Sequence, residues 1–586
     1  MKRFTRSFKS ICMAIAPLLT VAGCGSSDDA NMMTAAPMSG MMISEAITAR
    51  SGGSVSFPGG AISVAIPAGA LNQDTTVTIE KINGQTAAVS APLSANGETY
   101  TVSLGSGALL SRPMVLKMMA AAAPQRPQLG EIAQLANGTW VRLSANFYRS
   151  SDNSVVTLTT TPGSFRVVNR MLQAVTGASV ERGKDVFLHE TFGNEAFFGG
   201  VLKLQDVLNN VKPSDAVALG VQIDLDKVPA SMVAVLTGSD YAAKQSALQD
   251  AAVTRALIKA GAVIGVKGVY ANANSDLMTG AGITCALCHV TVAPTQFQLA
   301  AGASETALPI GSINLDGVPN AAMDAGKILS LTSAVQSLGA ADLLAHWGPG
   351  KFDIRALPDN PLDDGVNNPT QTPPLWNFVD LEAQGYAYDW DALFFSKTKM
   401  PDNSLASQAE AVYDLVMHAN GAFGIPNVGN FPPELRVTPP QSLVDALSAA
   451  EAASPGNVID TQKLLDVQDF ERSIVSPAPE AFDEELAQQG FMLFNDSTKG
   501  NCASCHSSAE FSGPAITHIT PTIFGGALAN GIKTPGLRGI GKTAPYFADG
   551  SAATLKDVVR LYVDQGIVNP LTDAEQAAIA EYLKSL

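Results

Sequence analysis

Cys285-Ala286-Leu287-Cys288-His289 and Cys502-Ala503-Ser504-Cys505-His506 are two copies of one pattern, in which two cysteines flank two residues and a histidine follows. Such a Cys-x-x-Cys-His run is typical of the covalent attachment of a c-type haem. The two thiols bond to the two vinyl groups of one porphyrin, and the histidine is placed to ligate the iron from the proximal side. The sequence therefore predicts two haem c groups, held by Cys285, Cys288 and His289 and by Cys502, Cys505 and His506.

Zinc binding and dithiol redox chemistry are the alternatives for these cysteines. Paired Cys-x-x-Cys units also hold structural zinc, but the pairs then usually lie some 15–20 residues apart. Here 217 positions separate Cys285 from Cys502, and neither zinc nor a thioredoxin-type dithiol requires a histidine after the second cysteine. Haem attachment is therefore the favoured interpretation of both motifs.

The N-terminus has the pattern of a bacterial export signal. Basic residues precede a short apolar stretch at 11–21, and Val21-Ala22-Gly23-Cys24 resembles a lipobox. The stretch is too short to span a bilayer, so residues 1–23 are predicted to be a cleaved signal peptide and Cys24 to carry lipid. Covalent haem attachment takes place on the exported side in bacteria. We therefore expect a membrane-anchored lipoprotein of the cell envelope, facing the periplasm or at the outer membrane.

Composition and charge narrow the class of protein further. Cys12 leaves with the signal, Cys24 carries lipid and the other four cysteines hold haem, so no disulfide is predicted. A chain of 586 residues with 46% hydrophobic content predicts two or more domains with apolar cores. The formal net charge of -16 argues against a nucleic-acid partner. An acidic surface keeps a protein soluble, and it also favours a basic electron carrier as a partner.

Residues 24–47 are predicted to be a flexible tether, because they lack periodicity and aromatic side chains. Clustered methionines offer soft thioether ligands for copper(I), which is the alternative interpretation of this segment. The methionines concerned are Met32, Met33, Met38, Met41 and Met42.

Residues 48–168 are predicted to form an antiparallel β-sandwich. Short runs alternate apolar with small or polar side chains, as at 62–66, and Gly59-Gly60 and 67–69 interrupt them as turns do. The run at 59–71 resembles the β-sandwich domain shared by zonula-occludens and netrin-receptor proteins. No catalytic constellation accompanies it, so we expect a role in spacing, docking or assembly.

Beyond the sandwich the pattern is mostly helical, with long loops rich in Pro, Gly and Asn. We expect two mainly α-helical cytochrome c-type domains, at 180–480 around the first motif and at 481–586 around the second. The clearest helices are predicted at 249–264 and 572–586, and a capping-box pattern opens the second of these helices. The predicted fold is therefore multidomain, with a β-sandwich followed by two haem-binding helical domains.

The residues around both motifs resemble the bacterial dihaem cytochrome c peroxidase superfamily, which includes the dihaem enzyme that matures tryptophan tryptophylquinone. The likeness covers about 180–586 and is carried by residues 191–197, 346–350, 372–377, 533–538 and 543–551. It implies two haem c groups that exchange electrons, hydrogen peroxide or dioxygen as oxidant, and a small cytochrome or cupredoxin as redox partner. It also implies a calcium ion between the haem domains, for which the sequence offers no recognisable ligand set.

The resemblance assigns roles near the first haem. His346, shortly before an Asn-x-Pro-Thr stretch, matches a histidine on the distal side of that haem. Trp390 matches the tryptophan that carries electrons between the haems, with Trp347 and Trp376 as alternatives.

The resemblance also places a distal acid–base pair. Gln408 matches a glutamine that precedes the distal carboxylate of the peroxidases by about ten residues. His418 stands where that acid is expected, and a histidine shuttles protons near neutral pH.

The second haem departs from the peroxidase pattern. In the peroxidases a methionine after the second motif ligates the iron and raises its potential. The last methionine here is Met492, ahead of Cys502, and Tyr562 stands at the matching position. The quinone-maturing enzyme has a tyrosinate there, so Tyr562 is the predicted iron ligand and His518 is the alternative.

The sequence thus predicts a dihaem peroxidase-like oxidoreductase. One alternative is an enzyme of the same fold that acts on an organic or protein substrate through peroxide or dioxygen. The other is a non-catalytic electron-transfer cytochrome in which both irons are six-coordinate.

Overall fold

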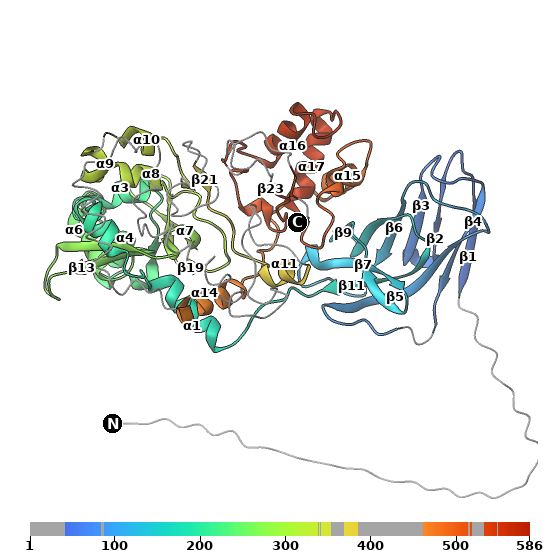
Figure 1. Cartoon of the computed structure of the whole chain (residues 1–586), viewed down its shortest axis with the longest axis horizontal. Coiled ribbons are helices and arrows are strands. Elements are labelled where there is room, and N and C mark those ends of the chain that lie inside the picture. The colour runs from blue at the N-terminus through green and yellow to red at the C-terminus, as the bar shows by residue number, and fades with distance from the viewer. Residues whose placement is uncertain are drawn as a thin grey trace, which may run out of the picture. The chain divides into compact units, whose positions relative to one another are not determined.

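The computed structural model describes residues 41–83, 87–337, 339, 341–352, 369–384, 461–513, 516–517, 532–547 and 549–586. A β-rich part comes first along the chain and helices dominate the C-terminal part, as Figure 1 shows in blue and in red. The predicted β-rich N-terminal region and the helical C-terminal region are therefore confirmed.

Two antiparallel sheets form the β-rich part (Figure 1). One sheet has the strand order β1-β4-β5-β11-β7-β8, and the other has the order β2-β3-β6-β10-β9. The strands are β1 Met42–Ile47, β2 Gly53–Ser56, β3 Ile62–Ile66, β4 Thr75–Lys81, β5 Leu93–Leu104, β6 Met114–Met119, β7 Gly130–Ala136, β8 Thr139–Arg142, β9 Asn146–Arg149, β10 Ser154–Thr159 and β11 Gly163–Arg170.

One apolar core joins these two sheets. In β3, Ile62, Val64 and Ile66 are buried while Ala65 is exposed, as the alternating sequence predicts. The core takes side chains from both sheets, among them Val77, Met114, Leu116 and Phe165. Burial of such a side chain contributes about 1.5–3 kcal/mol, so the shared core holds the sheets face to face.

The sheets extend beyond the predicted boundaries at both ends. Met42–Ile47, assigned above to the tether, forms β1 and pairs with β4, with Ile43 opposite Ile79. Ile47 is buried in the core, which accounts for the order of this segment. The sequence pattern missed β1 because four of its six side chains are exposed, as is usual for an edge strand.

Short helices and two-stranded sheets follow up to Phe352 (Figure 1). The helices, with the two later ones that pack with them, are α1 Ala178–His189, α2 Leu204–Leu208, α3 Pro213–Ala218, α4 Ala230–Thr237, α5 Tyr241–Leu248, α6 Ala251–Lys259, α7 Ala286–His289, α8 Ala325–Ser330, α9 Ser333–Ser337, α10 Ala341–Ala345, α11 Phe378–Gln384 and α14 Thr461–Glu471. The helix expected at 249–264 is α6, which ends early because Gly261 turns the chain at φ 70°.

The same region contains more strand than the sequence pattern predicted. The longest pair is an antiparallel hairpin, β13 at Val266–Tyr270 and β14 at Met278–Ile283. Gly268, Gly280 and Gly282 interrupt its apolar alternation, which explains why it did not stand out.

The C-terminal part contains α15 Glu484–Asn495, the 3-10 turns η6 Cys502–Ser504 and η7 Ile540–Lys542, the antiparallel strand pair β22 Ile516–Thr517 and β23 Ile532–Lys533, α16 Leu555–Asp564 and α17 Asp573–Lys584. Thr572 and Glu575 cap α17 reciprocally, so the predicted capping box is confirmed. None of the helices among the described residues is long and apolar enough to cross a membrane.

A glycine lies at each of two helix crossings. Where α1 packs on α14, a Cβ on Gly183 would lie 1.8 Å from the carbonyl oxygen of Asp466. Where α15 packs on α17, a Cβ on Gly490 would lie 1.9 Å from the carbonyl oxygen of Ala578. Because no side chain fits at either point, the two glycines allow the paired helices to approach closely.

Candidate haem-binding sites

Both Cys-x-x-Cys-His motifs fold into a single helical turn. The backbone N–H of His289 donates to the carbonyl of Cys285 at 3.2 Å, and that of His506 donates to the carbonyl of Cys502 at 3.0 Å. Each turn therefore carries the two cysteine thiols and the histidine imidazole of its motif within five residues. All four cysteines in these turns are free and half-buried, as covalent attachment to a porphyrin requires.

A hydrogen bond fixes the tautomer of His506. Its Nδ1 lies 2.6 Å from the carbonyl oxygen of Phe511. A carbonyl oxygen only accepts, so Nδ1 carries the proton and Nε2 is the nitrogen that ligates a metal. Partners of this kind orient a ligating histidine and raise its basicity. The second motif therefore fits a c-type haem with His506 as proximal ligand.

The crossing of α15 and α17 at Gly490 lies beside this histidine. We call a glycine helix crossing, together with the aromatic rings that follow it by one turn and lie beside the motif histidine, the frame of that motif. Phe494 follows Gly490 by one helical turn in α15, and its ring lies 6.4 Å from the His506 ring. Tyr582 follows Ala578 by one turn in α17, and its ring lies 5.2 Å from Phe494. The crossing thus places two aromatic rings beside the second motif.

The first motif has the same frame. Phe187 follows Gly183 by one turn in α1, and its ring lies 6.4 Å from the His289 ring. Phe470 follows Asp466 by one turn in α14, and its ring lies 5.1 Å from Phe187. A glycine crossing, two aromatic rings and the motif histidine therefore recur at equivalent positions around both motifs.

The environment of the thiols weighs against the alternatives. Burial raises the pKa of Cys288 to about 11 and that of Cys502 to about 12. It also raises the pKa of Cys285, with a further contribution from the carboxylate of Glu471. Dithiol redox centres instead depend on thiols with lowered pKa values.

The first cysteines of the two motifs also lie in different apolar clusters. Cys285 packs with Phe187 and Trp376, and Cys502 packs with Phe491 and Phe494. Within the part of the chain that the structure describes, no group of three or more His, Cys, Asp or Glu side chains is arranged to hold a metal ion.

Tyr562 of α16 lies close enough to the second motif for Cys502 and Cys505 to affect its hydroxyl. Burial and the charges of Cys502 and Cys505 raise the pKa of its hydroxyl to about 12. Its ring stacks on Phe547 with centroids 5.9 Å apart. The structure therefore brings Tyr562 to the motif for which the resemblance makes it a ligand, and ligation itself stays a prediction.

The other predicted residues lie in different surroundings. His346 follows α10 with an exposed side chain, and its Nδ1 bonds to the carbonyl of Asp342. Trp347 is buried in a separate core beside Leu344. Trp376 is buried with the first motif, and its Nε1 donates to the carbonyl of Arg538 at 2.9 Å.

Several predictions fall on positions outside the described residues. These are the signal peptide, the lipidated Cys24, the tether up to residue 40, and the site residues Trp390, Gln408, His418 and His518. Their roles stay predictions from the sequence.

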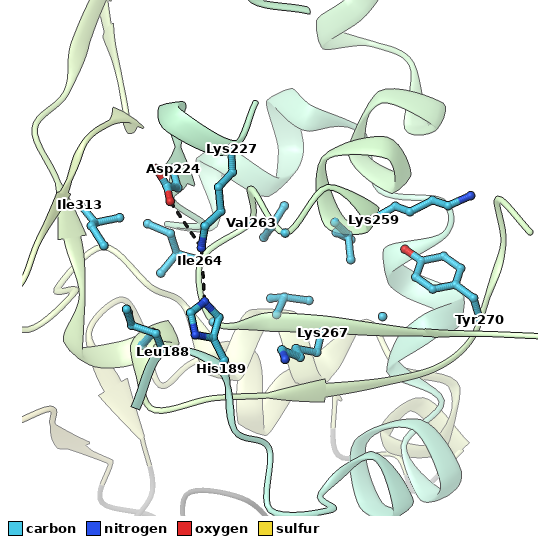
Figure 2. Close-up of a pocket in the computed structure, with 16 residues that line it drawn as sticks. Leu188, His189, Asp224, Lys227, Lys259, Val263, Ile264, Lys267, Tyr270 and Ile313 are labelled. Atoms are coloured by element: carbon cyan, nitrogen blue, oxygen red, sulfur yellow. Dashed lines mark hydrogen bonds and ion pairs between the residues drawn. The ribbon is translucent and has the colours of Figure 1, made fainter. Parts of the chain in front are cut away.

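A cavity of about 220 Å³ lies beside the first motif (Figure 2). In it, Lys227 Nζ lies 3.4 Å from His189 Nε2 and 3.6 Å from Asp224 Oδ2. Ligand pockets usually measure about 300–1,000 Å³, so this cavity is small. It reaches the first motif through Ala286, and none of the predicted site residues lines it.

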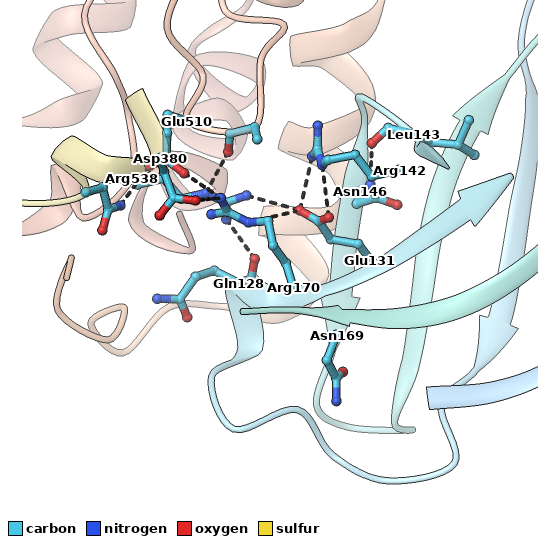
Figure 3. Close-up of polar contacts among 12 residues, drawn as sticks. Gln128, Glu131, Arg142, Leu143, Asn146, Asn169, Arg170, Asp380, Glu510 and Arg538 are labelled. Atoms are coloured by element: carbon cyan, nitrogen blue, oxygen red, sulfur yellow. Dashed lines mark hydrogen bonds and ion pairs between the residues drawn. The ribbon is translucent and has the colours of Figure 1, made fainter. Parts of the chain in front are cut away.

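A buried network of charges was not foreseen from the sequence (Figure 3). Arg170, the last residue of β11, donates to Glu510 at 2.7 Å and to Asp380 at 3.3 Å, and lies 3.7 Å from Glu131. Arg538 lies 3.4 Å from the same Glu131. All five side chains are at most 6% exposed, so the network joins the β-sandwich to the helical part in a dry environment.

We expect Asp380→Asn to stabilise the protein at neutral pH. Burial and the charge of Glu510 raise the pKa of Asp380 to about 6, so the folded state favours its protonated form. The stability that this group contributes is complete below its unfolded pKa of 3.8 and is lost as the pH rises through 6. Urea titrations should show equal unfolding free energies for both proteins at pH 3.5, and a gain of about 3 kcal/mol for the variant at pH 7. A loss of stability at pH 7 would contradict this prediction.

Comparison with known proteins gives matches of three kinds. Residues 487–586 match the family model of cytochrome c. The methylamine utilization protein MauG of Methylophilus methylotrophus is 30% identical over 123 residues, which cover 17% of this chain and 37% of that protein. A crystal structure of a MauG-like protein associated with microbial copper homeostasis is 21% identical, with a TM-score of 0.20, over 23% of this chain and 60% of that chain.

The sequence matches cover only part of this chain, residues 487–586 for the family model and 17% of the chain for MauG. The chain spans only 37% of the length of the MauG protein that it matches. The match of residues 487–586 to the cytochrome c family supports covalently bound haem c as a cofactor of the C-terminal part. Together, the family match and the MauG relative support a haem oxidoreductase.

Proposed function

We propose that the chain is an exported, lipid-anchored dihaem cytochrome c that reduces hydrogen peroxide to water. The observation that carries the proposal is the repeated frame, in which the glycine crossing and the ring 6.4 Å from the motif histidine occur at both motifs. One of the two frames belongs to the cytochrome c domain, and the second frame has the same parts. Cys285, Cys288 and His289 would hold the first haem, and Cys502, Cys505 and His506 the second.

The reaction takes two electrons and two protons for each hydrogen peroxide and yields two molecules of water. Bound haem supplies the redox chemistry, while the protein sets ligation, polarity and access. A small cytochrome or cupredoxin would deliver the electrons. The formal charge of the chain, -16, favours a donor with a basic surface.

Side chains outside the motifs would move the protons and connect the domains. His418 is proposed to take a proton from one peroxide oxygen and return it to the other, with Gln408 as the glutamine that accompanies the distal acid–base group in the peroxidases. Trp376 is buried with the first motif and bonds to the backbone of Arg538 in the cytochrome c domain. It therefore joins the two haem regions and competes with Trp390 for the position between the haems.

A second candidate function is oxidation of an organic or protein substrate through peroxide or dioxygen. The observation that favours it is Tyr562, which lies near the cysteines of the second motif in a chain that has no methionine after Met492. An anionic oxygen ligand stabilises oxidised iron, whereas methionine raises the potential. Turnover of peroxide with a small electron donor alone would separate the peroxidase from this candidate.

Electron paramagnetic resonance of the oxidised protein, with and without hydrogen peroxide, tests the proposal. We expect one high-spin ferric haem with an accessible iron, whose signal changes when peroxide is added, and one low-spin haem. Two low-spin haems that ignore peroxide, in both the oxidised and half-reduced protein, would exclude both enzymatic functions. They would leave the electron-transfer cytochrome.

Tyr562→Phe should convert the second haem from low spin to high spin, because it removes the hydroxyl proposed to ligate the iron. The first haem should keep its spectrum. Tyr546→Phe is the matched control, since Tyr546 is a buried tyrosine of the same domain whose pKa is raised without any contribution from the cysteine thiols. An unchanged second-haem spectrum in Tyr562→Phe would exclude Tyr562 as ligand.

A further inference from the structure

The proximal histidine of the second motif depends on a segment that the β-sandwich holds. His506 Nδ1 donates to the carbonyl oxygen of Phe511 at 2.6 Å. The adjacent residue, Glu510, is 2% exposed and accepts from Arg170 Nη1 at 2.7 Å. Arg170 ends β11 of the sandwich. Two hydrogen bonds and one peptide unit therefore connect the sandwich to His506.

Further contacts hold the same segment in place. Arg538 Nε donates to the carbonyl of Ala509 at 3.0 Å, and its guanidinium lies over the Phe511 ring at 5.0 Å. The second carboxylate oxygen of Glu510 accepts from Asn377 Nδ2 at 2.7 Å. Residues 509–511 are thus fixed from several directions, and Arg170 is the contact that comes from the sandwich.

These contacts fix the orientation of residues 509–511 more than they hold the β-sandwich and the helical part together. Apolar packing already joins the β-sandwich to the C-terminal helices. The ring centroid of Phe147 in β9 lies 5.9 Å from that of Phe491 and 6.1 Å from that of Tyr582. A buried ion pair adds little net stability over apolar packing of the same volume. Its directional bonds do fix the position of Glu510, and therefore that of the next carbonyl group.

We propose that Arg170 is a positioning residue for the second haem: through Glu510 it holds the Phe511 carbonyl that orients His506. The β-sandwich thereby sets the ligand field and the reduction potential of that haem. This inference rests on the proposed binding of haem iron by His506. It makes the sandwich a working part of the haem domain instead of a spacer.

The test compares haem-loaded Arg170→Gln and Arg170→Lys with Arg149→Gln. Arg149 also bonds from the sandwich to the helical part, through Glu485 and Gln488, but it does not touch residues 509–511. Haem content is measured first. Electron paramagnetic resonance and a spectroelectrochemical titration then give the g values and the midpoint potential of each haem.

We expect Arg170→Gln to change the g values of the second haem and to lower its midpoint potential, because a buried positive charge that is connected to His506 through Glu510 and Phe511 is lost. Arg170→Lys should restore part of both changes, since its ammonium can still pair with Glu510. Arg149→Gln should change neither haem. Glu510→Gln should move the potential of the second haem the opposite way, and it provides the test if Arg170→Gln does not fold.

Two outcomes would overturn the inference. The second haem could keep its g values and potential in both Arg170→Gln and Glu510→Gln, or Arg149→Gln could shift them equally. Absence of haem from the second motif of the parent protein would instead overturn the proposed function, so the two failures are distinguishable.

Discussion

Replacing Cys285 and Cys288 by serine should leave a protein with one covalently bound haem instead of two. Serine cannot form the thioether bonds that attach a porphyrin, so the first motif would lose its haem. The second motif lies in a separate apolar cluster around Cys502 and should keep its own haem. The haem content per chain, measured as the pyridine haemochrome and by mass of the denatured protein, should therefore fall from two to one.

The matched variant exchanges Cys502 and Cys505 for serine. It should also retain one haem, and removal of all four cysteines should retain none. If the first pair held zinc, its removal would lower the zinc content and leave the haem content unchanged. An unchanged haem content in the Cys285→Ser, Cys288→Ser protein would thus contradict the dihaem proposal, while leaving the cytochrome c domain at 487–586 in place.

The β-sandwich could be predicted because its signals are local. Buried and exposed side chains alternate in β3, and the predicted turn at Gly59-Gly60 has both residues at positive φ, 74° and 73°. The edge strand β1 and the glycine-rich hairpin of β13 and β14 were missed, because their alternation is weak. In these strands the pairing partner determines the structure, and the partner is not visible in the strand itself.

The two Cys-x-x-Cys-His motifs could be recognised for the same reason, whereas the common arrangement of the helices around them could not. Phe494 precedes Cys502 by 8 positions, but Phe187 precedes Cys285 by 98 positions. The long insertion hides the equivalence of the two helix crossings. A glycine followed by a phenylalanine four residues later, upstream of each motif, is the signal that would have revealed it.

The charge network was not predictable because each of its members is an isolated charge in the sequence. Arg170, Glu510 and Arg538 are far apart along the chain and meet only in the folded protein. Their effect on the second motif depends on one carbonyl group, that of Phe511, which no sequence pattern marks. The site therefore combines local motifs that the sequence reveals with long-range contacts that only the structure supplies.

Gly490→Ala and Gly183→Ala should each destabilise one of the two proposed haem regions. The new Cβ would lie 1.9 Å from the carbonyl oxygen of Ala578 or 1.8 Å from that of Asp466, so the crossing helices must separate. Overpacking of this kind costs roughly 3 kcal/mol, which outweighs the gain of about 1 kcal/mol from the higher helix propensity of alanine. Urea titrations that follow the spectrum of each haem should show the loss.

Gly541→Ala is the matched control for both variants. The new Cβ would lie 3.7 Å from its nearest neighbour, the Cα of Lys584, which is an ordinary van der Waals contact. It should change the unfolding free energy by less than about 0.5 kcal/mol. Gly490→Ala should lower the urea concentration at which the spectrum of the second haem changes to that of the unfolded protein. Gly183→Ala should do the same for the first haem. If Gly183→Ala affected neither haem, the crossing of α1 and α14 would not frame the first motif, and the argument from the repeated frame would fail.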